Sequence, residues 1–400
     1  MRKTTTMILL LASSCQVPVS DLQLVESAPL GTSIGSDDLP EFHETWLEMI
    51  ESAGESIELS HFYASNEPGS LLEPVVVALE QAAERGVRVR FLVDERFYET
   101  YPETLERLAR RSELEVRRLD LSETTGGVLH AKYMLTDGSR SCVGSANFDW
   151  RALEHIQELG ALVDHTTVAS ALGDVFELDW WLAGGGSPAD RPVSRVSAED
   201  FPVEVQMPNG AQVQVTPVFS PKDCLPSEDL WDLPYLIDWI NEAQQHIRLQ
   251  VMTFRMKGRA GESFEELESA LLRAGQRGVQ VQLLVADWGK RRGTIEGLKY
   301  LTQQPGIEVR MATIPPAETG HIPFARVIHS KFMVVDRDLT WIGSSNWERG
   351  YFYASRNAGL LVEGVACAQR LVEYFESGWD GPYSYAIDPD EEYVVPRIGD

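Results

Sequence analysis

Two stretches of this chain share one pattern. The first is His130-Ala131-Lys132-Tyr133-Met134-Leu135-Thr136-Asp137, followed by Gly144-Ser145-Ala146-Asn147. The second is His329-Ser330-Lys331-Phe332-Met333-Val334-Val335-Asp336, followed by Gly343-Ser344-Ser345-Asn346. The glycine comes fourteen residues after the histidine in both copies (144 − 130 and 343 − 329). Because the chain has only eight histidines, chance does not explain this agreement. The sequence therefore predicts a duplicated unit with one copy of the pattern in each half.

The geometry of a strand agrees with a site built from these residues. Residues i and i+2 face the same side of a strand, so His130 and Lys132 should point into one cleft while Tyr133 and Leu135 turn to the core. The pattern HxKxxxxD followed by GSxN, present twice, resembles that of the phospholipase D superfamily. The resemblance implies an α/β fold of two duplicated α/β/α halves, with mixed sheets packed around a pseudo-twofold axis and one active site.

In that arrangement two imidazoles would lie on opposite sides of one phosphorus atom. One of His130 and His329 would attack as the nucleophile, forming a phosphohistidine, and the other would protonate the leaving oxygen and then activate water or an alcohol. Groups that bind the phosphate oxygens would come from Lys132, Lys331, Asn147, Asn346, Ser145 and Ser344. We expect no metal ion and no cofactor, since the sequence shows no cluster of residues with metal-ligand spacing.

Further residues near the motifs belong to the expected site. Eleven residues after each motif asparagine stand Glu158 and Asn357 (158 − 147 and 357 − 346). In the superfamily a residue at that place can orient a histidine through its second ring nitrogen. Asp137 and Asp336 complete the motifs and are expected to be catalytic, although such a carboxylate can equally brace a loop. Large aromatic residues near the motifs could form a platform for bases or acyl chains, or belong to the core; these are Trp150, Trp288, Trp341, Trp347 and Tyr351.

The elements around the motifs repeat as strand, helix, strand, strand. Gly86 and Gly278 each follow a helical stretch, at the place where a helix C-terminus favours a left-handed residue. Helices that alternate with strands predict a mixed or parallel sheet flanked by helices in each half. Strands are predicted at 56–63, 87–93 and 114–119 in the first half and at 246–254, 279–285 and 307–314 in the second.

Composition divides the chain into five parts. Residues 1–15 carry Arg2 and Lys3 before an uncharged stretch that is too short to span a bilayer, which predicts an export signal. This stretch ends at Cys15 and is similar to a bacterial lipobox, so we expect a lipid anchor at Cys15. The protein would then lie in the cell envelope as an outer-membrane lipoprotein, or be secreted or periplasmic. The other parts are a polar tether at 16–40, the first half at 41–186, a linker at 187–212 and the second half at 213–400.

Charge and cysteine content bear on the partners. The formal net charge is −26, from 61 acidic and 35 basic residues. Nucleic-acid-binding proteins usually carry a basic surface, so this charge argues mildly against such a substrate, although net charge says little about a single cleft. Cys142, Cys224 and Cys367 could pair in an oxidising compartment, but their number is odd, and Cys142 is expected in the core. The oligomeric state stays open, with a homodimer as one expectation.

Several segments resemble a narrower branch, the animal lysosomal phospholipase D-like proteins and a related poxvirus enzyme. The likeness covers residues 50 to 380 and includes Phe148-Asp149-Trp150-Arg151-Ala152-Leu153 and Trp288-Gly289. It implies either hydrolysis or transfer of the phosphatidyl groups of phospholipids, or metal-independent 5′-to-3′ degradation of single-stranded nucleic acid. Acidity and an anchored start favour the phospholipid reaction, which is the first expectation. An inactive phosphate-binding module is a remote third one, because every motif position is filled.

Overall fold

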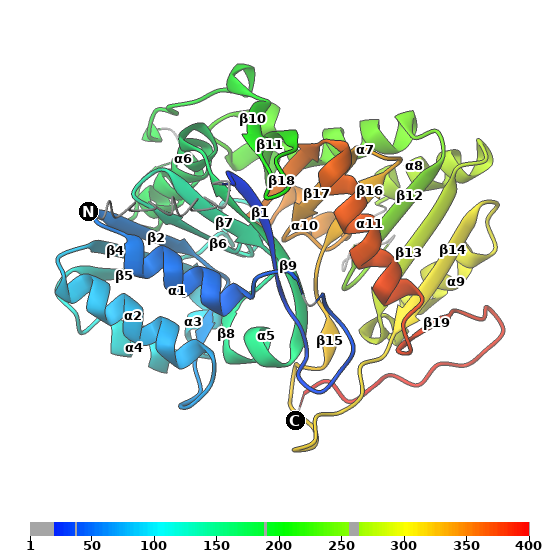
Figure 1. The fold of residues 1–400 in the computed structure, drawn as a ribbon, viewed down its shortest axis with the longest axis horizontal. Helices are drawn as coiled ribbons and strands as arrows, with labels where there is room; N and C mark the ends of the chain where they lie inside the picture. The colour runs from blue at the N-terminus through cyan, green and yellow to red at the C-terminus, as the bar shows by residue number, and fades with distance from the viewer. Residues whose placement is uncertain (1–19, 37, 188–189, 256–263, 400) are drawn as a thin grey trace, which may run out of the picture.

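The computed structural model describes residues 20–36, 38–187, 190–255 and 264–399. The expected export signal, Cys15 and the first residues of the expected tether lie outside this part of the chain. Figure 1 shows two α/β halves whose sheets lie side by side, with strands β9 and β15 at their border. Within the described residues no helix is both long and apolar enough to cross a bilayer.

The first half is built on a mixed sheet with the strand order β1-β9-β7-β6-β2-β4-β5. Only the pairs β2–β4 and β4–β5 of this order are parallel. The strands are β1 (Leu22–Ser27), β2 (Ser56–Ser60), β4 (Arg88–Asp94), β5 (Leu114–Leu119), β6 (Tyr133–Thr136), β7 (Arg140–Gly144) and β9 (Ile156–Asp164). A short pair joins β3 (Ala64–Ser65) to β8 (Phe148–Asp149). The helices are α1 (Phe42–Ser52), α2 (Leu72–Glu84), α3 (Glu95–Tyr98), α4 (Glu103–Leu108), α5 (Trp150–Glu154) and α6 (Thr166–Ala183).

The second half repeats this design in the order β10-β11-β18-β17-β16-β12-β13-β14-β19. Its strands are β10 (Val203–Gln206), β11 (Gln212–Ser220), β12 (His246–Val251), β13 (Gln280–Ala286), β14 (Ile307–Ala312), β16 (Phe332–Val335), β17 (Leu339–Gly343), β18 (Asn357–Glu363) and β19 (Ser384–Ala386). The helices are α7 (Asp232–Glu242), α8 (Glu266–Gln276), α9 (Ile295–Thr302), α10 (Arg349–Tyr353) and α11 (Val365–Trp379), with the 3₁₀ helix η5 at Asp287–Lys290. The strands β6, β7 and β9 correspond to β16, β17 and β18, so the predicted duplicated α/β fold is confirmed.

Two glycines explain where the helices α2 and α8 end. Gly86 and Gly278 end their helices with φ values of 90° and 93°, a left-handed backbone that glycine adopts without a steric penalty. The predicted strands at 56–63 and 246–254 are shorter in the structure, ending at Ser60 and Val251. Beyond these residues both segments turn towards the boundary between the halves, where they help to form the site.

The predicted tether at 16–40 needs the main correction, because part of it forms a strand of the first sheet. Leu22–Ser27 is an edge strand, β1, paired antiparallel with β9, and β11 occupies the same position against β18 in the second half. Leu22, Leu24 and Val25 are buried, and this short apolar strand lies inside an otherwise polar stretch. Likewise, the expected linker at 187–212 contains β10 and the first residue of β11.

The two halves share one of three hydrophobic core clusters. Helices α1 and α2 pack into a cluster of the first half, and α7 and α8 pack into a cluster of the second. Helices α6 and α11 contribute to a third cluster, which contains residues of both halves. Next to it the fully buried Arg356 forms an ion pair with Asp179 of α6, with an Nη2–Oδ1 distance of 2.8 Å. Neither half can therefore bury its inner face without the other.

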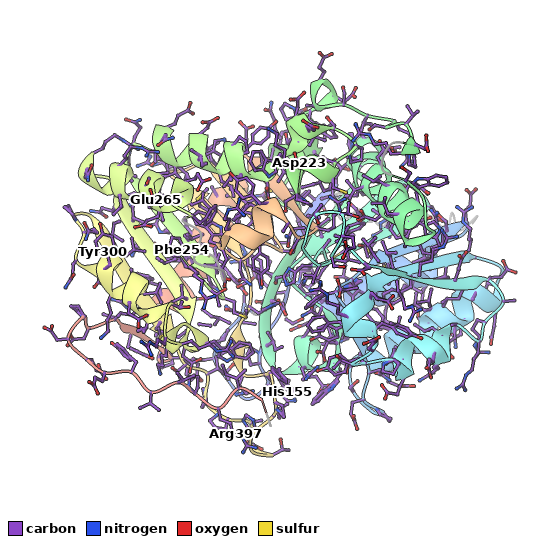
Figure 2. All side chains as sticks on the ribbon, turned by 180° about the vertical axis from the view of Figure 1, so that it is seen from behind. His155, Asp223, Phe254, Glu265, Tyr300 and Arg397 are labelled. Carbon is purple, nitrogen blue, oxygen red and sulfur yellow. The ribbon has the colours of Figure 1, made fainter. Side chains whose placement is uncertain are left out.

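Short backbone pairings cross the boundary symmetrically. The strand β15 (Val327–Ile328) of the second half pairs in parallel with Ile156 and Gln157 of β9. His155, labelled in Figure 2, lies at this border and its carbonyl accepts a 2.9 Å hydrogen bond from the backbone N–H of Arg326.

All three cysteines of the described chain are buried and unpaired, including Cys142, which lies in the core as expected.

Candidate active site

The two motif histidines meet at the boundary between the halves. Each lies in the loop segment just before its strand, β6 or β16, and not within a strand as predicted. The backbone N–H of His130 donates to the carbonyl of Arg356, and that of His329 donates to the carbonyl of Gln157, both at 2.8 Å. Pairing with the opposite half positions these segments. Both imidazoles line one cavity of about 570 Å³ and are only 5% and 7% exposed.

The orienting residues cross from one half to the other. Glu158 of β9 accepts at both carboxylate oxygens from Nδ1 of His329, at 2.9 Å. Asn357 of β18 lies with its Oδ1 3.0 Å from Nδ1 of His130. Each residue thus orients the histidine of the other half, leaving Nε2 of each imidazole as the atom for chemistry. The two partners differ in kind, one a carboxylate and the other an amide.

The motif lysines bring positive charge to the same place. Lys132 and Lys331 are 2% and 0% exposed, and each amino group donates to the backbone carbonyl of its own motif histidine. Burial holds the pKa of Lys132 well below its usual range, and the charge of Lys331 lowers it further. Burial lowers the pKa of Lys331 to about 7, against the opposing effect of Glu158. A phosphate dianion or monoanion between them would restore both charges.

The same environment disfavours the charged form of both histidines. Burial lowers the pKa of His130 well below its ordinary value, and the charges of Lys132 and Lys331 lower it further. Burial also lowers the pKa of His329, but here Glu158 acts in the opposite direction. A neutral imidazole with Nδ1–H bonded to an acceptor has a free lone pair at Nε2, as a nucleophile or base requires.

The motif serines, which were predicted to bind the phosphate, lie buried beside the residues that orient the histidines. The hydroxyl of Ser145 donates to Glu158 at 2.5 Å, and that of Ser344 donates to Asn357 at 3.0 Å. Both serines are fully buried. Ser145 and Ser344 therefore hold the residues that orient the histidines, which is a correction to their expected role.

The motif asparagines occupy unequal positions. Asn147 lines the cavity, and its Oδ1 has no partner among the described residues. Asn346 is fully buried, accepting at Oδ1 from the backbone N–H of Thr253 at 3.3 Å and donating to the hydroxyl of Tyr351 at 3.2 Å. Asn147 is thus free to contact substrate directly, whereas Asn346 also holds the segment at Thr253.

The motif aspartates lie at the far ends of β6 and β16, away from the cavity. Asp137 accepts hydrogen bonds from the backbone N–H groups of Gly54, Glu55 and Ser56 at 2.8–2.9 Å. Asp336 does the same for residues 244–246 at 2.7–2.9 Å. Both have left-handed backbones, with φ of 52° and 51°. Contrary to the expected catalytic role, they brace the turns that lead into β2 and β12.

Aromatic side chains that the motifs do not reveal form one wall of the cavity. The ring centroids of Phe62 and Phe97 are 3.8 Å apart, and those of Tyr63 and Tyr101 are 5.0 Å apart in a stacked pair. Phe62 also lies 5.1 Å from the His130 ring. These residues follow the carboxyl ends of β2 and β4, and this position was the only indication of them in the sequence. Arg96 of α3 lines the same wall.

The aromatic residues near the motifs divide between cavity and core. Trp288 and Tyr351 line the cavity, and the Tyr351 ring lies 4.9 Å from that of His130. Trp341 and Trp347 are buried in the core of the second half.

Among the described residues, no group of three or more His, Cys, Asp or Glu side chains is arranged to hold a metal ion.

Comparisons with known proteins identify the family of this chain. The family described as "Cardiolipin synthase, PLD-like domain" matches residues 46–180 and 236–379. The 5′-3′ exonuclease PLD3 of Bos taurus is 31% identical over 93% of this chain and 81% of that protein. The virion nicking-joining enzyme of Vaccinia virus is 30% identical over 91% of this chain and 89% of that protein. A phosphatidylserine synthase structure from Haemophilus influenzae shares the fold, with a TM-score of 0.63 at 14% identity over 92% of this chain and 87% of that one.

The chain therefore belongs to the phospholipase D superfamily, as a phosphodiesterase with both halves of the site in one polypeptide. Within that superfamily it stands in the branch of the animal exonucleases and the poxvirus nicking-joining enzymes.

Proposed function

We propose that this phosphodiesterase cleaves single-stranded nucleic acid from its 5′ end. The observation that carries the proposal is the aromatic wall beside His130, where Phe62, Phe97, Tyr63 and Tyr101 form contacting pairs. Nucleobases stack on such rings without regard to sequence, contributing about 1–3 kcal/mol per base. Two relatives that match most of the chain carry names of nucleic-acid enzymes, the 5′-3′ exonuclease and the nicking-joining enzyme.

The site supports a two-step reaction. In the first step Nε2 of one neutral histidine attacks phosphorus, the bond to the leaving oxygen breaks, and the other histidine, protonated at Nε2, donates that proton to the leaving oxygen. In the second step the histidine that served as the acid takes a proton from water. The water oxygen attacks phosphorus, and the bond between phosphorus and the nucleophilic histidine breaks. Lys132, Lys331 and Asn147 stabilise the charge on the non-bridging oxygens throughout.

A substrate comparison tests this proposal. The purified protein is incubated, with EDTA present, with 5′-hydroxyl single-stranded DNA and separately with phosphatidylglycerol vesicles. We expect the DNA to be shortened from its 5′ end, and EDTA to have no effect. His130→Ala and His329→Ala should each lower turnover by about 10²–10⁴, the usual contribution of a positioned acid or base. Turnover of either variant within about tenfold of wild type would refute the two-histidine scheme.

Phosphatidyl hydrolysis or transfer is the second candidate, and one observation favours it. Much of the cavity lining is apolar, including Val128, Ile156, Met252, Val327 and the half-exposed Phe324. Such a surface could hold acyl chains beside the phosphate. Release of phosphatidic acid from phosphatidylglycerol, with single-stranded DNA left intact, would establish this activity in place of the nuclease.

We also propose that the protein is exported and anchored by lipid at Cys15. The proposal is supported by the basic start, the short uncharged stretch and the lipobox-like residues before this cysteine. Metabolic labelling with palmitate should mark the wild-type protein and leave Cys15→Ser unlabelled. Equal labelling of both would contradict the anchor.

A further inference from the structure

A second, smaller pocket adjoins the catalytic cavity on the side of the second half. Its volume is about 350 Å³, and Trp288 lines both spaces. The other lining residues are polar or charged, namely Thr253, Arg255, Arg291, Thr294 and Glu348. Trp288 therefore lies between the two spaces.

The catalytic motif itself positions this pocket. The backbone of 253–255 runs beside the residues that follow the second GSxN motif, with Trp347 N–H donating to Thr253 O at 3.1 Å and Arg255 N–H donating to Trp347 O at 2.9 Å. Phe254, labelled in Figure 2, is buried against Trp347 and anchors the segment. Consequently Met252 faces the catalytic cavity, while Thr253 and Arg255 face the second pocket.

The pocket concentrates positive charge in a chain whose net charge is −26. Nε of Arg255 donates to the hydroxyl of Thr294 at 3.3 Å, and the Arg291 guanidinium lies 6.0 Å from the Trp288 ring centroid. Within the described part of the chain no ion pair is found for either guanidinium, while Arg248 and Arg310 do form ion pairs. Arg291 belongs to the basic run Lys290-Arg291-Arg292. One carboxylate, that of Glu348, also lines the pocket and accepts from the Thr253 hydroxyl at 2.6 Å.

We propose that this pocket binds the phosphate next to the scissile one in a single strand, with Arg255 and Arg291 as its ligands. Trp288 would stack on the base between the two phosphates. Paired guanidinium groups suit a phosphate, because their N–H groups form charge-assisted hydrogen bonds to its oxygens. The inference rests on the proposed nuclease function, since phosphatidylglycerol has no second phosphate to occupy the pocket.

Substrates with one and two phosphates test this inference. The measured quantity is kcat/KM for a 5′-hydroxyl trinucleotide, with two phosphates, divided by kcat/KM for the dinucleoside monophosphate, with one. We expect a ratio of about ten or more in the wild type. In Arg255→Gln/Arg291→Gln the ratio should fall close to one. A neutral methylphosphonate at the second linkage should lower the ratio for the wild type in the same way.

A charge-matched control separates the pocket from a general effect of charge. Arg110→Gln/Arg337→Gln removes two exposed arginines that lie outside both cavities, and its ratio should equal that of the wild type. The dependence of log kcat/KM on log salt concentration should become shallower by about 0.7 in the Arg255/Arg291 variant only, the value for one phosphate contact on a single strand.

The outcomes distinguish this inference from the proposed function. If the wild type cleaves both nucleotides equally well, or the Arg255/Arg291 variant keeps the wild-type ratio, the pocket does not bind a phosphate. An equal loss on both substrates would also overturn the inference, because the arginines would then act on the catalytic cavity itself. Cleavage of phosphatidylglycerol with neither nucleotide cleaved would refute the nuclease function, and the inference with it.

Discussion

At the residue scale, the unequal partners of the two histidines distinguish their roles. The carboxylate of Glu158 favours a proton on His329, whereas the amide of Asn357 provides no charge to His130. Burial lowers the pKa of both imidazoles, but only for His329 does a neighbouring anion oppose it. His329 is therefore the better acid for the leaving oxygen, and His130 the better nucleophile.

Replacing Glu158 with Gln tests this assignment. The change keeps an acceptor for His329 but removes the negative charge, so the pKa of His329 should fall further. Because an acid must be protonated, the high-pH limb of kcat/KM against pH should move to lower pH by about one unit. Asn357→Ala is the comparison, since of the two histidines it removes the partner of His130 and not that of His329. A shift of the low-pH limb alone would instead make His329 the nucleophile.

The motif aspartates should affect stability and not chemistry. Asp137→Ala and Asp336→Ala each remove three hydrogen bonds to backbone N–H groups and place alanine at a positive φ. Each substitution should lower the free energy of unfolding by about 1–2 kcal/mol. The loss is smaller than for a buried carboxylate, because solvent screens these side chains, which are at least partly exposed. Urea unfolding measures this loss. A fall in kcat/KM of about 10² or more, with unchanged stability, would return these residues to the catalytic machinery.

The sequence predicted some of these residues better than others. The spacing of the histidines and lysines was sufficient, because the chemistry needs those residue types at one phosphate. The spacing could not show that Asp137 lies outside the site. A turn that needs a hydrogen-bond acceptor and a reaction that needs a carboxylate both call for an aspartate at this position. Phe97 and Tyr101 lie beyond any motif, and only the folded chain brings them beside His130.

At the scale of elements, β1 shows where composition misleads. It is a six-residue strand in a stretch rich in Ser, Pro, Gly and Asp, and only Leu22, Leu24 and Val25 in it are apolar. Sequence features predicted the strands of each half that carry clear alternation or lie beside a helix. An edge strand is specified by the open edge of β9, which the local sequence does not contain.

The stability contributed by β1 should depend on pH. Glu26 of β1 is 1% exposed, and burial raises its pKa from 4.5 to about 7. The folded protein then holds a proton that the unfolded chain releases, so the free energy of unfolding should fall as pH rises from 4.5 to 7. Glu26→Gln should weaken this dependence and stabilise the protein at pH 8 by about 2–3 kcal/mol. Urea unfolding at pH 5 and pH 8 measures both effects.

Two comparisons delimit that prediction. Glu41, beside β1, also has its pKa raised to about 7 by burial, so part of the pH dependence should remain in Glu26→Gln. Glu67→Gln changes an exposed carboxylate and should behave as the wild type. Identical pH dependence in Glu26→Gln and the wild type would show that Glu26 is already ionised in the folded protein.

At the scale of the whole molecule, one chain supplies the whole site. His130 and His329 line the same cavity, and residues of both halves form the central core cluster. A mixture of His130→Ala and His329→Ala proteins should therefore show no more activity than the two variants measured separately. Recovery of activity in the mixture would mean that halves of different chains combine in a dimer.

The crossed contacts of Glu158 and Asn357 also restrict how such a protein can evolve. A single ancestral half would present its histidine without an orienting partner, so it could work only by pairing with a second copy of itself. In that state any change of the orienting residue alters both histidines at once. Two separately encoded copies of the half remove this coupling, and one partner can then become an amide while the other remains a carboxylate. The difference between Glu158 and Asn357 thus requires two copies that vary separately, as the two halves of this chain do.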